Sequence, residues 1–147
     1  MRQTVQIQPL AAPDRAAWEL LARGYKAFYE TEIADAEYAT AWQRLLHDSR
    51  FVGLGAWQNG SLVGTVHALF HTSTWADEVC YLQDLFVADA ARGQGAASAL
   101  IGAVASAARA RKATRLYWLT HTHNARARAL YDRVAVNKGF IRYDLGL

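Results

Sequence analysis

The spacing of apolar residues in the first third of the chain predicts a short strand followed by two helices. Val5 and Ile7 alternate with polar neighbours before Pro9, which is typical of a strand. Apolar and aromatic residues then recur at helical spacing across residues 14–29. Residues 35–47 predict a second helix, so a helical pair is expected to follow the first strand.

The rest of the chain predicts a hairpin and then alternating strands and helices. Residues 51–57 and 62–70 are largely apolar and flank Asn59-Gly60, a pair that favours a tight turn between two strands. The elements expected after this hairpin are a strand at 78–87, a helix of small residues at 96–111, a strand at 115–120, a helix at 124–137 and a strand at 140–145. No linker or repeat interrupts this order, which predicts one α+β domain over residues 1–147.

Composition narrows the class of protein. The 147 residues are 52% hydrophobic and 20% charged. No apolar run approaches the roughly 20 residues of a membrane span, and no basic-then-apolar leader is expected at Met1. We therefore expect a soluble cytoplasmic protein with no membrane partner. Cys80 is the single cysteine, which excludes an internal disulfide and a thiolate zinc cluster and predicts a reduced core thiol and no metal site.

The charge distribution indicates a small anionic ligand. The formal net charge is +3, and the basic residues concentrate between Arg92 and Arg142. A nucleic-acid surface would need stacking aromatic residues among these cations, whereas the aromatic residues here lie mostly in other segments. The pattern therefore favours a polyanionic small molecule over nucleic acid.

A glycine-containing bend supplies a candidate site for that anion. The strand at 78–87 leads to Arg92-Gly93-Gln94-Gly95-Ala96-Ala97, where glycines and small residues let backbone N–H groups approach an anion at a helix start. A P-loop would need Lys-Ser or Lys-Thr after the second glycine, and a dinucleotide fingerprint would need a third glycine and an acidic residue about 20 positions on. The bend predicts a diphosphate ligand, unless its glycines serve the turn alone.

Two blocks resemble the GCN5-related N-acetyltransferase (GNAT) family. Arg92, Gly95 and Ala97 fit the acetyl-coenzyme A loop of that family, and residues 124–131 followed by Gly139-Phe140 are similar to its helix that ends in Leu-Tyr and then Gly-Phe. Residues 70–75 and then 81–84 look most like the diamine acetyltransferases and their Hpa2-like relatives. The resemblance implies the GNAT fold: a twisted, mostly antiparallel sheet with a splayed parallel pair of strands and about four helices.

The resemblance also implies which residues hold acetyl-CoA and which assist the reaction. Tyr131 corresponds to the family's general acid toward the coenzyme A sulfur, although periodicity alone favours a tyrosine that packs on Leu130 and Phe140. The strand before the bend would offer its backbone to the pantetheine arm and to the thioester oxygen. The cofactor-binding residues expected on this basis are Leu85, Phe86, Val87, Arg92, Gly93, Gln94, Gly95, Ala96, Ala97, Ser98, Asn124, Arg126 and Ala127.

The general base is open at this point. Diamine acetyltransferases carry a glutamate where this chain has Gln83, which cannot accept a proton. Asp84 is the candidate base, but in a regular strand it would point to the opposite face, so it would act through a bulge or a water. His71, His121 and His123 are alternatives, as is loss of the amine proton to solvent before binding.

The acceptor and the partner are predicted only by class. We expect a small primary amine, such as a polyamine or a lysine-like compound, because acidic residues follow the aromatic residues of the first helix. Alternatives are a protein or peptide amino group, or a non-catalytic acyl-CoA-binding module. The chain leaves room for one strand after the last helix, so a sheet edge would be exposed and covered by a second copy in a homodimer. The acceptor-side residues expected are Tyr25, Tyr29, Trp75, Gln83 and Leu119.

Overall fold

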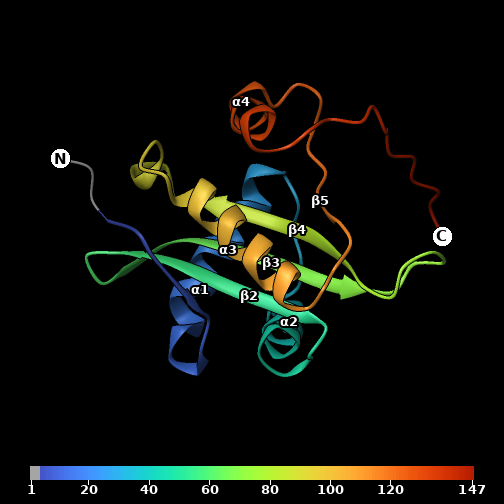
Figure 1. Cartoon of the computed structure of the whole chain (residues 1–147). Helices are drawn as coiled ribbons and strands as arrows, with labels where there is room; N and C mark the ends of the chain where they lie inside the picture. Colours follow the sequence, from blue (N-terminus) through green and yellow to red (C-terminus); the bar gives the residue numbers. More distant parts are fainter. Residues whose placement is uncertain (1–3) are drawn as a thin grey trace.

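One twisted five-stranded sheet forms the centre of the molecule (Figure 1). A computed structural model describes residues 4–147, so Met1 and the expectation placed there lie outside the described residues. The strand order is β1-β2-β3-β4-β5, antiparallel throughout except for the parallel pair β4–β5. The α+β fold class with a parallel pair is thereby confirmed. The strands are β1 (Gln6–Pro9), β2 (Phe51–Gln58), β3 (Ser61–His71), β4 (Val79–Val87) and β5 (Leu116–Tyr117).

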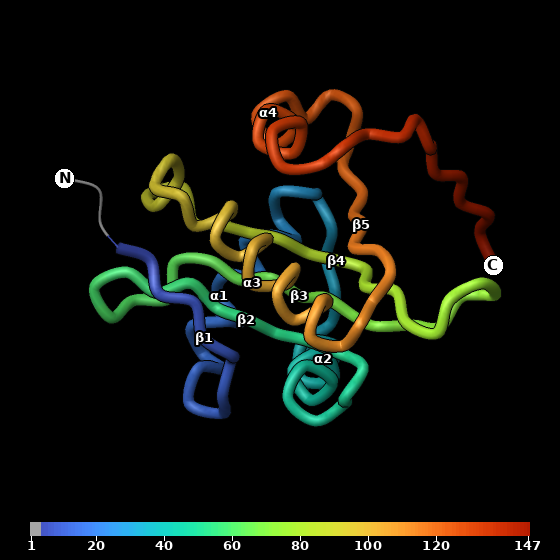
Figure 2. The backbone as a smooth tube through the Cα atoms, viewed as in Figure 1, coloured from blue at the N-terminus to red at the C-terminus, as the bar shows by residue number. Residues whose placement is uncertain are grey.

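Helices cover both faces of the sheet (Figure 2). The helices α1 (Arg15–Phe28) and α2 (Asp35–His47) pack on one face, and α3 (Ala96–Ala110) packs on the other. The fourth helix, α4 (Ala125–Val134), adds Leu130 and Tyr131 to the core beside α3. Short 3-10 turns lie at Ala12–Asp14 and Asp89–Ala91. Among residues 4–147 we find no helix with the length and apolar character needed to cross a bilayer.

The main hydrophobic core lies between α3 and the sheet. Leu100 and Val104 of α3 are completely buried against Val66 and Ala68 of β3. The small residues that dominate α3 let its backbone lie close to the sheet. A second core on the opposite face centres on Trp18 and is completed by Leu10, Tyr38 and Trp42.

A β-bulge interrupts the pairing of β3 with β4. Leu82 pairs with Ala68 and Asp84 pairs with His67, which leaves Gln83 as an extra residue in β4. Leu82 and, beyond the bulge, Leu85 both pack on the α3 core. Because of the bulge, Gln83 and Asp84 both line a cavity on the α1–α2 face. A bulge was one of the two ways in which Asp84 was expected to reach that side.

The parallel pair separates after two residues. Cys80 pairs with Leu116 and Tyr81 pairs with Tyr117, and beyond Tyr81 no residue of β5 pairs with β4. The backbone of the second half of β4 is thus left without a strand partner on that side. This separation opens the space that α3 and α4 border.

The C-terminal segment differs from its prediction. The helix expected to reach residue 137 ends at Val134, and the strand expected at 140–145 is absent, because residues 135–147 form no regular structure. The strand expected at 115–120 shortens to two residues. A strand needs an edge to pair with, and this segment reaches none within its own chain. The apolar side chains of residues 140–145 remain exposed, from 73% for Ile141 to 88% for Phe140.

Truncating Leu100 tests the importance of the α3 core. Leu100→Ala removes a completely buried side chain, and it should lower the free energy of unfolding by about 2–5 kcal/mol. Urea denaturation followed by circular dichroism measures this change. The matched control is Leu20→Ala on α1, where the side chain is 75% exposed and the change should stay within about 0.5 kcal/mol. Equal losses in the two variants would contradict this description of the core.

Candidate active site

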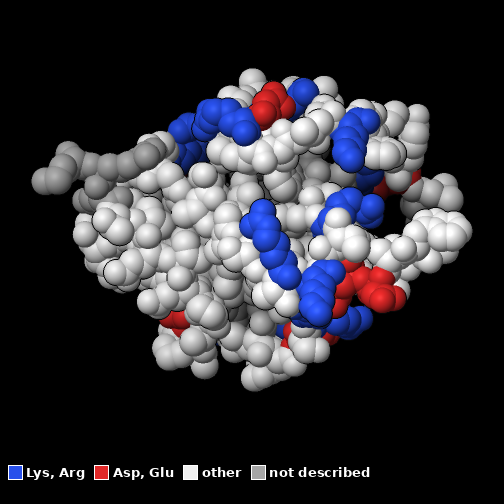
Figure 3. Space-filling model, in the orientation of Figure 1, with Lys and Arg blue, Asp and Glu red and all other residues white. Residues whose placement is uncertain are grey.

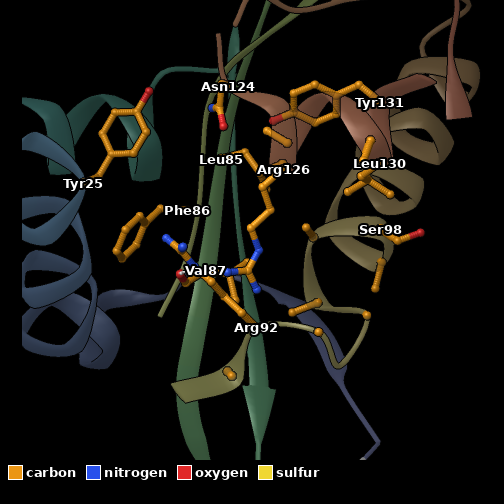
Figure 4. Close-up of a pocket in the computed structure, with 18 of the residues that line it drawn as sticks. Tyr25, Leu85, Phe86, Val87, Arg92, Ser98, Asn124, Arg126, Leu130 and Tyr131 are labelled. Carbon is orange, nitrogen blue, oxygen red and sulfur yellow. Dashed lines mark hydrogen bonds between the residues drawn. The ribbon is translucent and has the colours of Figure 1, made fainter. Parts of the chain in front are cut away.

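The separation of β4 from β5 opens a cavity of about 760 Å³, which we call the α3–α4 cavity (Figure 4). Gln94 is the one residue of the expected cofactor set that turns away from it, since its side chain accepts a hydrogen bond from Gln58 at 3.1 Å. The residues of that set that line the cavity are Leu85, Phe86, Val87, Arg92, Gly93, Gly95, Ala96, Ala97, Ser98, Asn124, Arg126 and Ala127.

The glycine-containing bend forms one end of this cavity. Gly93 and Gly95 have φ values of 80° and 89°, a left-handed conformation that favours glycine over residues with a side chain. Helix α3 begins directly after Gly95. The first N–H groups of a helix lack carbonyl partners within it and carry the positive end of the helix dipole, so this end of the cavity suits an anion.

Arginine side chains reinforce the positive potential of the cavity. The guanidinium groups of Arg92 and Arg126 point into the same space (Figure 4), and Arg133 also lines it. No aspartate or glutamate is among the lining residues of this described cavity. Lys and Arg side chains also gather on the rim over α4 (Figure 3). Arg92 also pairs through Nε with the exposed Asp89 at 3.2 Å, and cations that converge on one cavity fit a diphosphate.

Tyr131 reaches this cavity from α4 with its hydroxyl directed toward the second half of β4 (Figure 4). Its ring packs edge-on against Trp118, with ring centroids 5.4 Å apart. Burial, and then the nearby Tyr29 phenol, raise the pKa of Tyr131. The hydroxyl therefore keeps its proton at neutral pH and is a donor.

A second cavity, of about 570 Å³, lies on the α1–α2 face of the sheet, and we call it the α1–α2 cavity. Tyr25 and Phe86 line both cavities, so the two cavities adjoin at these side chains. Acidic and basic side chains both line the α1–α2 cavity: Asp84 and Glu37 with Lys26 and Arg44. Aromatic walls and charges of both signs suit a small zwitterionic molecule.

Asp84 ends a short hydrogen-bonded chain of side chains. The indole Nε1 of Trp18 donates to Nε2 of His67 at 2.8 Å, and Nδ1 of His67 lies 3.0 Å from Oδ2 of Asp84. Burial alone would raise the pKa of Asp84. The hydrogen bond from the His67 ring and its electrostatic attraction, the charge of Lys26 and the Tyr25 hydroxyl outweigh burial and leave the pKa of Asp84 below its usual value.

The half-buried Tyr25 of α1 lies beside this anion. Burial, followed by the negative charge of Asp84, raises the pKa of Tyr25, so the hydroxyl beside the carboxylate keeps its proton. Asp84 is thus a carboxylate anion at neutral pH, and the hydroxyl of Tyr25 beside it is a neutral donor. Such a group can hold an ammonium ion.

Not every residue expected on the acceptor side reaches these cavities. Tyr29 lines the α3–α4 cavity, and Gln83 lines the α1–α2 cavity. Trp75 lies 93% exposed between β3 and β4, and Leu119 is 49% exposed beyond β5; neither lines either cavity. Among the acidic residues that follow the first helix, Glu37 lines the α1–α2 cavity. Asp35 lies outside it, exposed and 2.8 Å from Arg23.

The histidines considered as bases also lie outside both cavities. His71 is engaged by the Tyr117 hydroxyl at 3.0 Å, and His121 stacks on His123. Sequence reasoning missed His67. The available signal was a polar residue between Val66 and Ala68 in an otherwise apolar strand.

Comparison with known proteins identifies the family. The model of the acetyltransferase (GNAT) family matches residues 15–135. The chain is 29% identical over 143 residues to the D-amino-acid N-acetyltransferase HPA3 of Saccharomyces cerevisiae, covering 95% of this chain and 89% of the relative. It is 31% identical over 148 residues to the uncharacterized N-acetyltransferase YhfO of Bacillus subtilis, covering 97% and 98% of the two chains.

A solved structure agrees with this result at the level of the fold. The structure of AAC(6')-Iy in complex with the bisubstrate analogue CoA-S-monomethyl-acetylneamine superposes with a TM-score of 0.86 at 15% identity, covering 98% of this chain and 99% of that one. The glycine bend, the separated parallel strands and the family match lead to one conclusion. The chain belongs to the acetyltransferase (GNAT) family and is an acetyl-CoA-dependent N-acetyltransferase.

Proposed function

We propose that this N-acetyltransferase acetylates the primary amine of a small acceptor that also carries a carboxylate, as an amino acid does. The observation that carries the proposal is the mixed charge of the α1–α2 cavity, where Asp84 and Glu37 lie with Lys26 and Arg44. A polyamine would leave the two cations without a partner, so a lysine-like acceptor fits better than a polyamine. The name of the yeast relative, a D-amino-acid N-acetyltransferase, supports the same class of acceptor.

The α3–α4 cavity would hold the cofactor. Arg92, Arg126 and the N-terminus of α3 would bind its diphosphate, and the unpaired backbone of residues 85–87 would align the pantetheine arm. Backbone N–H groups of that segment would also stabilise negative charge on the thioester oxygen. When bound, acetyl-CoA supplies the acetyl thioester that the amine attacks.

Asp84 and Tyr131 would move the protons. The carboxylate of Asp84 binds the acceptor ammonium and takes one proton from its nitrogen, which leaves a neutral amine. As the C–N bond forms and the C–S bond breaks, the Tyr131 hydroxyl gives its proton to the departing sulfur. The second proton, which the nitrogen loses as the amide forms, returns to the Tyr131 oxygen through solvent, and Asp84 releases its proton to solvent after turnover. The directions of the two pKa shifts fix the starting protonation states: Asp84 is an anion before the acceptor binds, and Tyr131 keeps its proton.

Replacing Tyr131 by Phe tests the acid. Tyr131→Phe removes the hydroxyl and keeps the ring, so kcat should fall about 100-fold while the affinity for coenzyme A hardly changes. Thiol release measures the first quantity and calorimetry the second. The control is Tyr143→Phe, at an 87% exposed tyrosine, which should match the wild type. An undiminished kcat in Tyr131→Phe would exclude Tyr131 as the acid.

Lysine and cadaverine form a matched pair for testing the acceptor, because they differ only by the carboxylate. We expect kcat/KM to be at least about 10-fold higher for lysine, the effect of one hydrogen bond to a charged group. Thiol release measures both values, with amino-acid enantiomers, spermidine and a lysine peptide completing the panel. Preference for cadaverine or spermidine would restore the polyamine interpretation, and preference for the peptide would favour a protein acceptor.

Lysine and cadaverine also show where the acceptor carboxylate binds. Lys26→Met removes a charge from the α1–α2 cavity with little change in length, and it should abolish the preference for lysine over cadaverine. Lys112→Met, at an exposed position beyond α3, should keep that preference. A preference that survives Lys26→Met would place the acceptor carboxylate elsewhere.

We further propose that residues 1–147 form one acetyltransferase domain that assembles as a homodimer through its C-terminal segment. Ile141, Tyr143 and Leu145 alternate with polar residues, and Arg142 donates to Asp144 at 3.0 Å, so side chains two apart share a face as in a strand. The outer edge of β5 has no strand partner among the described residues. If two copies exchanged their C-terminal segments, each segment would pair with the β5 edge of the other copy. A foreign partner would pair with either the segment or the edge.

Mixing two cysteine variants tests this exchange. Leu119→Cys places a thiol near the β5 edge, and Tyr143→Cys places one on the segment; oxidation of an equimolar mixture should cross-link the two variants. Light scattering should give twice the 16.3 kDa chain mass. A third variant carries both cysteines in one chain. If the protein is a monomer and a disulfide forms only within this double variant, the C-terminal segment folds onto the β5 edge of its own chain.

A further inference from the structure

Two side chains behind Asp84 have no role in the proton transfers described above. Trp18 is 1% exposed, and its indole Nε1 lies 2.8 Å from Nε2 of His67. The His67 side chain is 15% exposed and the Asp84 side chain 23% exposed. The chain of contacts therefore runs from the core between α1 and α2 to a carboxylate at the cavity surface.

The hydrogen bond from Trp18 determines where the proton of His67 lies. An indole N–H can only donate, so Nε2 of His67 must accept with its lone pair. A neutral imidazole carries one N–H, which places the proton of His67 on Nδ1, facing Oδ2 of Asp84 at 3.0 Å. A second proton on Nε2 would direct two donors at each other across 2.8 Å.

The other groups around this ring leave that assignment intact. The Thr65 hydroxyl lies 3.4 Å from the same Nε2 and can donate to it. The remaining ionisable groups lining the cavity around Asp84 are Tyr25 and Lys26 on α1, Tyr38, Glu37 and Arg44 on α2. None of them is hydrogen-bonded to the His67 ring in the described residues.

We propose that Trp18 and His67 form a tautomer lock that holds Asp84 as an oriented anion facing the acceptor. His67 donates one hydrogen bond from Nδ1 to Oδ2 and does not take the acceptor proton, so it is a positioning residue and Asp84 is the group that receives the proton. This inference rests on the proposed function for its catalytic consequence. The lock itself is a property of the resting protein.

Nitrogen NMR of isotope-labelled histidine tests the lock without any acceptor. At neutral pH the His67 ring should show a protonated Nδ1 and an unprotonated Nε2. Trp18→Phe keeps an aromatic ring and removes the indole donor, so the proton should then be found on Nε2 as well as on Nδ1. A protonated Nε2 in the wild type at neutral pH would overturn the lock, whatever the enzyme acetylates.

A series of substitutions at His67 tests the catalytic consequence. His67→Asn places an amide N–H near the position of Nδ1, His67→Gln places one near Nε2, and His67→Ala places none. We expect kcat/KM for the acceptor to fall about 10- to 100-fold in the Ala and Gln variants, as for a lost hydrogen bond to a charged group, and to recover most of that loss in the Asn variant.

The affinity for coenzyme A should be unchanged throughout this series, because His67 does not line the α3–α4 cavity. Equal losses in the Asn, Gln and Ala variants would show that His67 only packs, and would overturn the positioning role. If no amine is acetylated while NMR still finds the Nδ1 proton, the proposed acceptor reaction fails and the lock stands.

Discussion

The early end of the pairing between β4 and β5 is the constraint on which the rest of the site depends. Backbone groups in a buried strand need partners, and the second half of β4 has β3 on one side and an open cavity on the other. A ligand that offers amide groups of its own can complete that edge. The pantetheine arm of acetyl-CoA has this chemistry, so the gap in the sheet serves as the binding surface.

The two cavities on either side of Phe86 depend on different parts of the chain. The α3–α4 cavity relies on backbone geometry, on glycines with positive φ and on arginines, features that a local motif specifies. The α1–α2 cavity relies on side chains from two helices and two strands that are distant in sequence. This difference explains why the family and its cofactor could be predicted from the sequence while the acceptor remains a proposal.

The fold was predictable where local signals decide it. Helix α2 has the predicted bounds at Asp35 and His47, and the Asn59-Gly60 hairpin is confirmed. Cys80 is buried, and burial raises the pKa of its thiol to about 11, in keeping with an unreactive core residue. The prediction of a C-terminal strand was wrong, because a strand forms only against an available edge. Residues 140–145 have the sequence pattern of a strand, but no strand edge of their own chain pairs with them.

The position of Asp84 follows from the cost of burying a charge. In a regular strand one of the adjacent polar residues Gln83 and Asp84 would point into the α3 core, among side chains such as Leu100 that are completely buried. An ionised carboxylate without partners there would cost far more than one lost backbone pairing. The bulge removes the conflict, since the extra residue lets both polar groups face the α1–α2 cavity while Leu82 and Leu85 stay in the core. Two consecutive polar residues inside an apolar strand are therefore a readable signal for a bulge. His67 could not be identified in the same way, because its importance depends on Trp18, which lies 49 residues away in the sequence.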